Sequence, residues 1–182
     1  MARKVQKELT PAESVKIVKK LVKDKKRINK ADWVPGNIIY TYYLAKDMTQ
    51  VYDRTPLVLI LRRNKTHTLG LNFHWIPFKM RDNLARYILK LNKKNIEQGK
   101  PLEFSYRQLK PILKNYGYAP CIRLYINHRF RSSGTVIPPD RLVEVARLRT
   151  ETFTKGKYTA EQLYAKAVKD GRRRAKARKR KK

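Results

Sequence analysis

The chain has 182 residues and carries 45 lysines and arginines against 14 aspartates and glutamates, which gives a formal net charge of +31. The length suits one domain with appendages. So high a net charge opposes a compact free state, and it indicates a polyanionic partner, most commonly nucleic acid. The sequence has no apolar run of about 18 residues, so no membrane span is predicted. The N-terminus lacks the apolar core of a signal peptide. The single cysteine excludes an internal disulfide.

Residues 1–32 are predicted to form a basic N-terminal helix outside the core domain. Thr10 and Glu13 flank Pro11 in a capping box that has the proline at the first helical position. The apolar stripe that follows is surrounded by lysines, as in an amphipathic helix, and consists of Val15, Ile17, Val18, Leu21 and Val22. Such a helix packs on the body with a solvated outer face, lies against phosphates, or does both.

The core domain is predicted to span residues 33–150 and to begin with three strands. Residues 37–45 have apolar side chains on both faces, residues 57–61 form a continuous apolar run, and residues 67–76 alternate apolar with polar or small side chains. These adjoining strands favour a meander, which a small antiparallel sheet or partly closed barrel completes. Gly70, in the third strand, indicates a close backbone approach.

Helical periodicity replaces the strand pattern after Pro77. A helix is expected from Met80 to about Asn92, and a polar loop over residues 93–100. The element after the loop is expected to be a short turn followed by a helix, because a proline at position 111 lies too deep for an undisturbed helix.

The rest of the core domain is predicted to return to the sheet and then to end in a helix. The helix after Pro111 is expected to stop at Gly117, and residues 121–130 alternate as in a further strand. Its inward side chains are predicted to be Ile122, Leu124 and Ile126. A turn is expected at residues 132–135, and a helix over residues 138–149.

Residues 151–170 are predicted to hold a C-terminal helix, which runs from Tyr158 to Asp170 and ends at Gly171. In the tail, residues 171–182, nine of the last eleven residues are lysine or arginine. Because this charge density forbids a packed core, we expect the tail to be disordered, or only weakly helical, until it meets an anion. The predicted fold class is therefore α+β: a small antiparallel sheet or partly closed barrel, decorated by amphipathic helices, with a basic disordered C-terminal tail.

No residue pattern supports catalysis. The histidines His67, His74 and His128 lack metal-ligand spacing, and the acidic residues lack the pairing that a metal-dependent nuclease needs. By residue type, Cys121 and His128 could form a nucleophile and its base. We expect Cys121 instead to be a small buried thiol. His74 lies between aromatic residues and is expected to be structural. We therefore predict no catalytic residue, no metal and no cofactor, and a protein that is not an enzyme.

Basic residues gather in three places that suit phosphate contact. The turn between the second and third predicted strands is cationic, although such a turn is equally typical of ordinary solvated surface. Arg129 and Arg131 lie near aromatic side chains that can stack on bases. The tail is the strongest signal, since neutralising about six to nine phosphates makes binding steeply salt-dependent and independent of sequence. The predicted nucleic-acid-binding residues are Arg62, Arg63, Lys65, Arg129, Arg131, Arg172, Arg173, Arg174, Lys176, Arg178, Lys179 and Arg180.

One stretch of the core resembles a known family. Tyr52-Asp53 is followed by Thr55-Pro56-Leu57-Val58, then by LGLNFHWIP at residues 69–77, and then by a basic amphipathic helix. Over residues 36–92 this combination resembles small virion-associated proteins of tailed bacteriophages, the DNA end protector-like family. The resemblance implies a role at or near the end of the packaged genome, in or beside the head and neck. It assigns no site residue, and it does not extend to the basic flanks.

Charge and resemblance together predict a phage virion structural protein that binds packaged double-stranded DNA through its phosphates, at or near the genome end. Other virion proteins, such as portal, neck or tail components, are its expected partners. The protein would be made in the host cytoplasm and located in the virion. Two alternatives stay open: an architectural subunit of a neck or tail assembly with incidental DNA contact, and a ribosome-associated RNA-binding protein.

Overall fold

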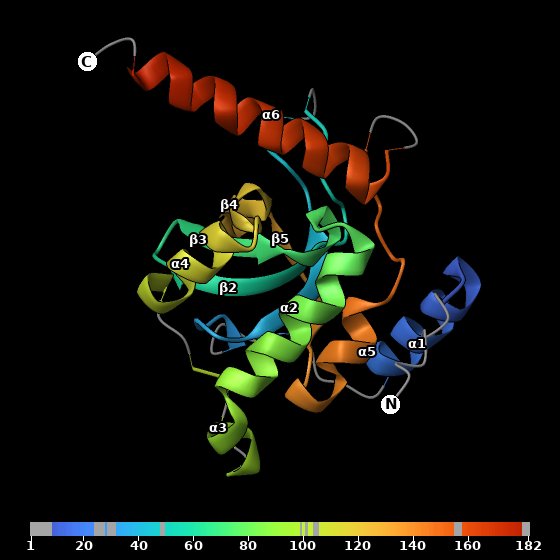
Figure 1. The fold of residues 1–182 in the computed structure, drawn as a ribbon. Helices are drawn as coiled ribbons and strands as arrows, with labels where there is room; N and C mark the ends of the chain where they lie inside the picture. Colours follow the sequence, from blue (N-terminus) through green and yellow to red (C-terminus); the bar gives the residue numbers. More distant parts are fainter. Residues whose placement is uncertain are drawn as a thin grey trace, which may run out of the picture.

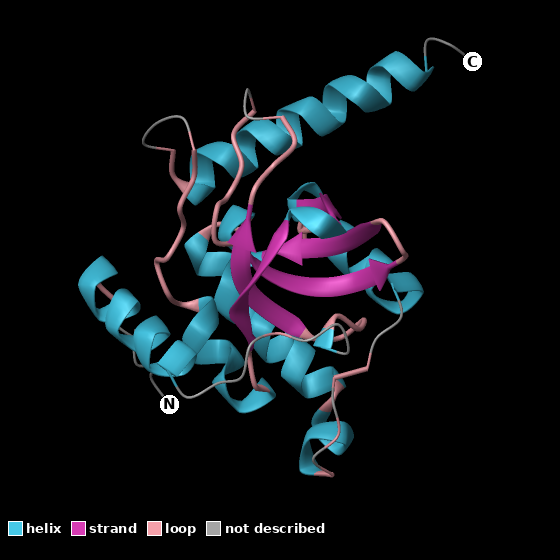
Figure 2. Ribbon diagram, turned by 180° about the vertical axis from the view of Figure 1, so that it is seen from behind, coloured by secondary structure: helices cyan, strands magenta, loops and turns pink. Residues whose placement is uncertain are grey.

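The computed structural model describes residues 9–23, 28, 32–47, 50–98, 100, 102–103, 106–154 and 158–179. Its centre is one antiparallel sheet with the strand order β4-β3-β2-β1-β5 (Figure 2). The strands are β1 (Ile38–Tyr43), β2 (Leu57–Arg63), β3 (His67–Asn72), β4 (Ile122–Ile126) and β5 (Phe130–Val136). The predicted meander of the first three strands is confirmed.

The sheet is curled, and the link between its two edge strands shows why. β4 and β5 lie at opposite edges, yet only the 3-10 turn η4 (Asn127–Arg129) joins them. The edges of a flat five-stranded sheet lie about 19 Å apart, whereas four Cα–Cα steps span at most about 15 Å. The edges must therefore approach each other. The predicted α+β class with a partly closed barrel is confirmed.

Both faces of β2 are buried, each against a different partner. Leu57, Leu59 and Leu61 join the main core, which also contains side chains of α2 (Phe78–Leu91), α4 (Tyr106–Asn115) and α5 (Leu142–Ala146). Val58 packs inside the curl with Tyr43 and Tyr125. The interior is so tight that a Cβ on Gly70 would lie 2.2 Å from Cγ1 of Val58. Gly70 is thus a position of close approach, but by the Val58 side chain rather than by the backbone as predicted.

Helices cover the sheet on one side (Figure 1). The N-terminal helix α1 (Pro11–Lys23) begins with the predicted capping box, in which the Thr10 backbone N–H donates to Oε2 of Glu13 at 2.7 Å. Ser14 Oγ accepts the backbone N–H of Arg149 at 3.0 Å, so α1 is docked on the body. α3 (Lys93–Glu97) is a short helix in the region predicted as a polar loop.

Several predicted boundaries are wrong. β3 ends at Asn72, because its side-chain Oδ1 accepts the backbone N–H of His74 and starts the 3-10 turn η2 (Phe73–Trp75). Residues 132–135 belong to β5 rather than to a turn. The helix expected over residues 138–149 is the 3-10 turn η5 (Pro139–Arg141) followed by the five-residue α5.

Two further predictions are wrong, one on the inward face of β4 and one on a break at Pro111. The faces of β4 are the reverse of those predicted from hydropathy. Leu124 is 64% exposed and Tyr125 is 5% exposed, because the Tyr125 ring packs with Tyr43 inside the curl.

α4 continues past Pro111 without a break. Gly117 does follow the end of α4, with φ at +76°, the left-handed conformation that glycine allows.

The C-terminal helix is longer than predicted. α6 (Ala160–Lys179) runs through Gly171, the residue expected to end it, and through most of the segment expected to be disordered. A Cβ built on Gly171 would point into open space, so nothing in the described structure packs against that position of the helix. Arg180 lies outside the described residues. None of the helices described is both long and apolar enough to cross a membrane.

Candidate nucleic-acid interface

The turn between β2 and β3 is held by one asparagine. Oδ1 of Asn64 accepts the backbone N–H groups of Thr66 and His67, at 2.9 and 2.7 Å. This Asx-type turn leaves Lys65 exposed at the tip, and Arg62 is exposed on the strand just before it. The tip therefore presents cations to solvent, as the sequence predicted.

Arg63 has a different placement from its neighbours. Its guanidinium lies 5.4 Å from the ring centroid of Trp33 and donates to the Trp33 carbonyl oxygen at 3.3 Å. The side chain is partly buried, so in this structure it ties the segment before β1 to the sheet.

The η4 turn is bound directly to the hairpin tip. The Asn127 amide donates to the carbonyl oxygens of Asn64 and Lys65, at 2.9 and 3.2 Å, and its oxygen accepts from Thr68 at 2.7 Å. Two predicted site residues that are 64 positions apart, Lys65 and Arg129, are thereby brought to one place.

Lys65 and Arg129 line a hollow of about 440 Å³, which we call the cationic hollow. Its described lining contains no acidic residue and consists of Lys46, Lys65, Thr66, His67, Ile126, Asn127, His128 and Arg129. The Nε atom of Arg129 is buried and has no hydrogen-bond partner among the described residues. Lys46, Lys65 and Arg129 line the hollow and its described lining holds no acidic residue, which favours an anion such as a phosphate group.

The other predicted cations lie apart from the hollow. Arg131 is exposed on β5. On α6, the segment from Arg172 to Lys179, which we call the basic arm, extends away from the body (Figure 1). Arg172, Arg173 and Lys176 are exposed on it, and Arg174, Arg178 and Lys179 belong to the same helical segment. Contact of any of these residues with DNA remains a prediction.

The first half of α6 anchors the arm to the body. Leu163 is 1% exposed. The Tyr164 hydroxyl donates to the Gly117 carbonyl oxygen at 2.9 Å, and Oε1 of Glu161 accepts the backbone N–H of Phe78 at the start of α2. Since three separate contacts fix this half, the direction of the arm is set by the core.

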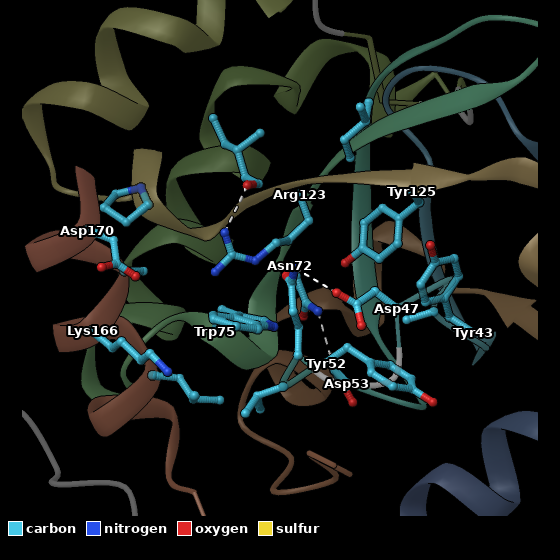
Figure 3. Close-up of a pocket in the computed structure, with 18 of the residues that line it drawn as sticks. Tyr43, Asp47, Tyr52, Asp53, Asn72, Trp75, Arg123, Tyr125, Lys166 and Asp170 are labelled. Carbon is cyan, nitrogen blue, oxygen red and sulfur yellow. Dashed lines mark hydrogen bonds between the residues drawn. The ribbon is translucent and has the colours of Figure 1, made fainter. Parts of the chain in front are cut away.

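A second hollow, about 930 Å³ in volume, lies between β4, the loop before β2, and α6 (Figure 3). We call it the aromatic groove. Five of its lining residues carry aromatic rings, namely Tyr43, Tyr52, Trp75, Tyr125 and Tyr158. The guanidinium of Arg123 lies over the Trp75 ring, 3.6 Å from its centroid. The sequence prediction missed this groove. The one available signal was the interleaving of arginine and aromatic residues from Arg123 to Phe130.

The distinctive motif residues Asp53 and His74 form a buried pair. Nδ1 of His74 and Oδ2 of Asp53 are 2.6 Å apart, and each side chain is 1% exposed. Burial favours the neutral acid, but the His74 imidazole and the backbone N–H groups of Thr152 and Thr55 outweigh it, so the pKa of Asp53 lies below its ordinary value. Thr150 Oγ1 lies 3.2 Å from Nε2 of His74. Thr150, His74 and Asp53 follow the order of a hydrolase triad, with the imidazole and the carboxylate buried and Thr150 partly exposed.

The thiol of Cys121, the other candidate considered for catalysis, is also buried. Cys121 is fully buried beside the Trp75 carbonyl oxygen, and burial raises the pKa of its thiol to about 12, which keeps it protonated at neutral pH. The expected buried thiol is confirmed. The described residues include no group of three or more His, Cys, Asp or Glu side chains that could hold a metal ion.

Comparison with family models matches residues 4–167 to the phage T4 terminal DNA protecting protein. The chain belongs to this family. The resemblance noted over residues 36–92 is thus confirmed, and it extends to α1 and to the anchored half of α6. The cationic hollow and most of the aromatic groove lie within the match, whereas the basic arm lies beyond it. Comparisons with curated proteins and with solved structures gave no match.

Proposed function

We propose that the protein binds the ends of a phage's double-stranded DNA through its phosphates, independently of sequence, and shields them from exonucleases without being an enzyme itself. The observation that carries the proposal is membership of the terminal DNA protecting family over nearly the whole chain. The cationic hollow supplies a site of suitable charge, and the net charge of +31 supplies long-range attraction.

The proposed location is the virion, at or near the genome end in the head or neck, next to portal, neck or tail components. Support comes from the phage family and from the charge, since packaged DNA is a dense store of phosphate onto which a strongly basic protein partitions. The family favours phage DNA over the ribosomal RNA alternative. Immunoblotting of purified particles checks the location, and the protein's absence from them would contradict it.

End recognition is tested with two duplexes of equal length and sequence, one linear and one covalently closed. The protein is expected to delay digestion of the linear duplex by a double-strand exonuclease. Unlabelled linear DNA should also displace a labelled end-containing duplex better than the closed circle does, because only the linear form offers ends. If the two forms compete equally, the protein binds DNA without selecting its ends, and the end-specific proposal is overturned.

The cationic hollow is tested by charge removal at Lys65 and Arg129. Each single change to alanine is expected to weaken DNA binding for all sequences alike and to lower the slope of log affinity against log salt by about 1, because one phosphate contact is lost. Fluorescence anisotropy over a salt series measures both quantities. Lys90→Ala, an exposed lysine on α2 outside the hollow, is the charge-matched control. A slope equal to that of this control would exclude the hollow as a phosphate site.

A further inference from the structure

The aromatic groove continues from the cationic hollow. Lys46 and Ile126 line both. A DNA strand with a phosphate in the hollow is therefore led along the β4 edge toward the space between β4 and α6. The two spaces differ in chemistry, and this difference indicates what each can hold.

The groove is not a second phosphate site. Lys46, Arg123 and Lys166 are balanced there by Asp47, Asp53 and Asp170, of which Asp170 lies on α6, across the groove from Asp47 (Figure 3). Its distinguishing feature is flat surface: the Arg123 guanidinium lies over the Trp75 ring, and the Phe153 ring contacts that indole edge-on at 5.9 Å. Stacked guanidinium and aromatic planes are the surfaces on which proteins hold unpaired bases.

The groove also contains a hydrogen-bonding group that the described chain does not satisfy. Tyr125 is 5% exposed, and its hydroxyl is buried without a hydrogen-bond partner among the described residues. The neighbouring Asn72 amide nitrogen donates one hydrogen to Oδ2 of Asp53, and its oxygen accepts the backbone N–H of His74. A buried hydroxyl without a partner costs free energy, and a ligand with donor and acceptor atoms removes that cost.

We propose that the aromatic groove binds an unpaired terminal nucleotide of the DNA end, with its base stacked at the Arg123–Trp75 pair and within reach of the Tyr125 hydroxyl. The inference rests on the proposed function and names the form of end that the protein selects: a frayed or single-stranded terminus. The volume of the groove, about 930 Å³, lies within the range of sites for small ligands, roughly 300–1,000 Å³. This volume is too small for a duplex.

Three duplexes of equal length test the proposal with the full-length protein: one that ends blunt, one with a short single-stranded overhang, and one closed at both ends by hairpin loops. A 2-aminopurine base is placed either at the overhang terminus or inside the duplex. We expect the overhang duplex to bind best, and the fluorescence of the terminal base alone to be quenched on binding, because only that base stacks in the groove.

Variants then assign the effect to the groove. Arg123→Ala is expected to weaken binding of the overhang duplex by roughly tenfold, the loss of one stacking contact, and to abolish the quenching. Tyr125→Phe, which removes only the hydroxyl, should reduce the preference for the overhang without affecting folding. Arg107→Ala removes the same charge from an exposed position on α4 outside the groove and should change neither.

The outcomes separate the two proposals. If the protein prefers linear over circular DNA but binds the blunt duplex as tightly as the overhang duplex and quenches no terminal base, the groove proposal is overturned and end binding stands. The same holds if quenching persists in both Arg123→Ala and Tyr125→Phe. If linear DNA is not preferred over the closed circle, end binding fails and the groove proposal falls with it.

Discussion

Replacing Asp53 with asparagine is expected to lower the free energy of unfolding by about 2 to 3 kcal/mol, because a hydrogen bond to a buried charged group contributes about 1.5 to 3 kcal/mol. The wild-type carboxylate contacts Nδ1 of His74 at 2.6 Å and also accepts the backbone N–H groups of Thr55 and Thr152. An amide keeps the shape of the side chain but loses its charge and one acceptor. Chemical denaturation at neutral pH measures the change.

This pair has a large effect because it joins two distant segments. The backbone N–H of Arg54 donates to the Thr152 carbonyl oxygen at 3.1 Å, and that of Thr154 donates to the Tyr52 carbonyl oxygen at 2.9 Å. The segment 150–154 leads from α5 toward α6. The Asp53 variant should therefore loosen the support of α6 as well as the sheet.

The same carboxylate predicts a pH dependence. Because the pKa of Asp53 is lower in the folded protein than in the unfolded chain, its contribution to stability is complete above the unfolded pKa of about 4 and is lost as the pH falls through the folded pKa. Wild-type stability should decline below about pH 4. Asp53→Asn should decline less, with the remainder due to groups such as Asp82 and Glu161, whose pKa values are also lowered.

Asp140→Asn provides the matched control, since Asp140 is exposed at η5. A surface change of this kind shifts stability by at most about 0.5 kcal/mol. An Asp53 variant that unfolds within that margin of the wild type, or that has an identical acid profile, would show that the buried pair is not a main support of the fold.

Deleting residues 171–182 is expected to produce the largest change in DNA binding. The segment contains nine lysines and arginines, and if it neutralises about six to nine phosphates its loss lowers the salt slope by about 5 to 8. Affinity at moderate salt should fall by roughly a thousandfold or more. The fold should persist, because the contacts that anchor α6 come from residues 160–164.

The deletion also separates the two phage hypotheses. Loss of DNA binding while particles still assemble supports the DNA-binding function, whereas failed assembly with DNA binding intact supports an architectural subunit whose arm inserts into a protein assembly. Replacing the lysines and arginines of the same segment with glutamine is the matched control, since it removes the charge but keeps the length. If this variant binds DNA as tightly as the wild type, the arm makes no phosphate contacts.

Much of the fold could be predicted from the sequence because local rules dominate there. The capping box at Thr10, the β-rich run at Leu57 and the helical period after Pro77 each act within a few residues, and each formed the expected element. The motif around Asp53 and His74 identified the family. Its physical role, a buried polar link, was missed because the segment 150–154 that completes it lies about a hundred positions away.

The site shows the same division. The sequence by itself determined the charge, the phage family and the cations of the hairpin tip and the arm, since these follow from residue identity. Only the tertiary structure decided that Arg129 joins Lys65 in one hollow and that Arg123 lies over Trp75. It also decided that Tyr125 points into the curl, against the hydropathy of its strand. The reason is that hydropathy fixes the period of a strand, whereas the curl of the sheet and the space above Gly70 decide which face has room for a large ring.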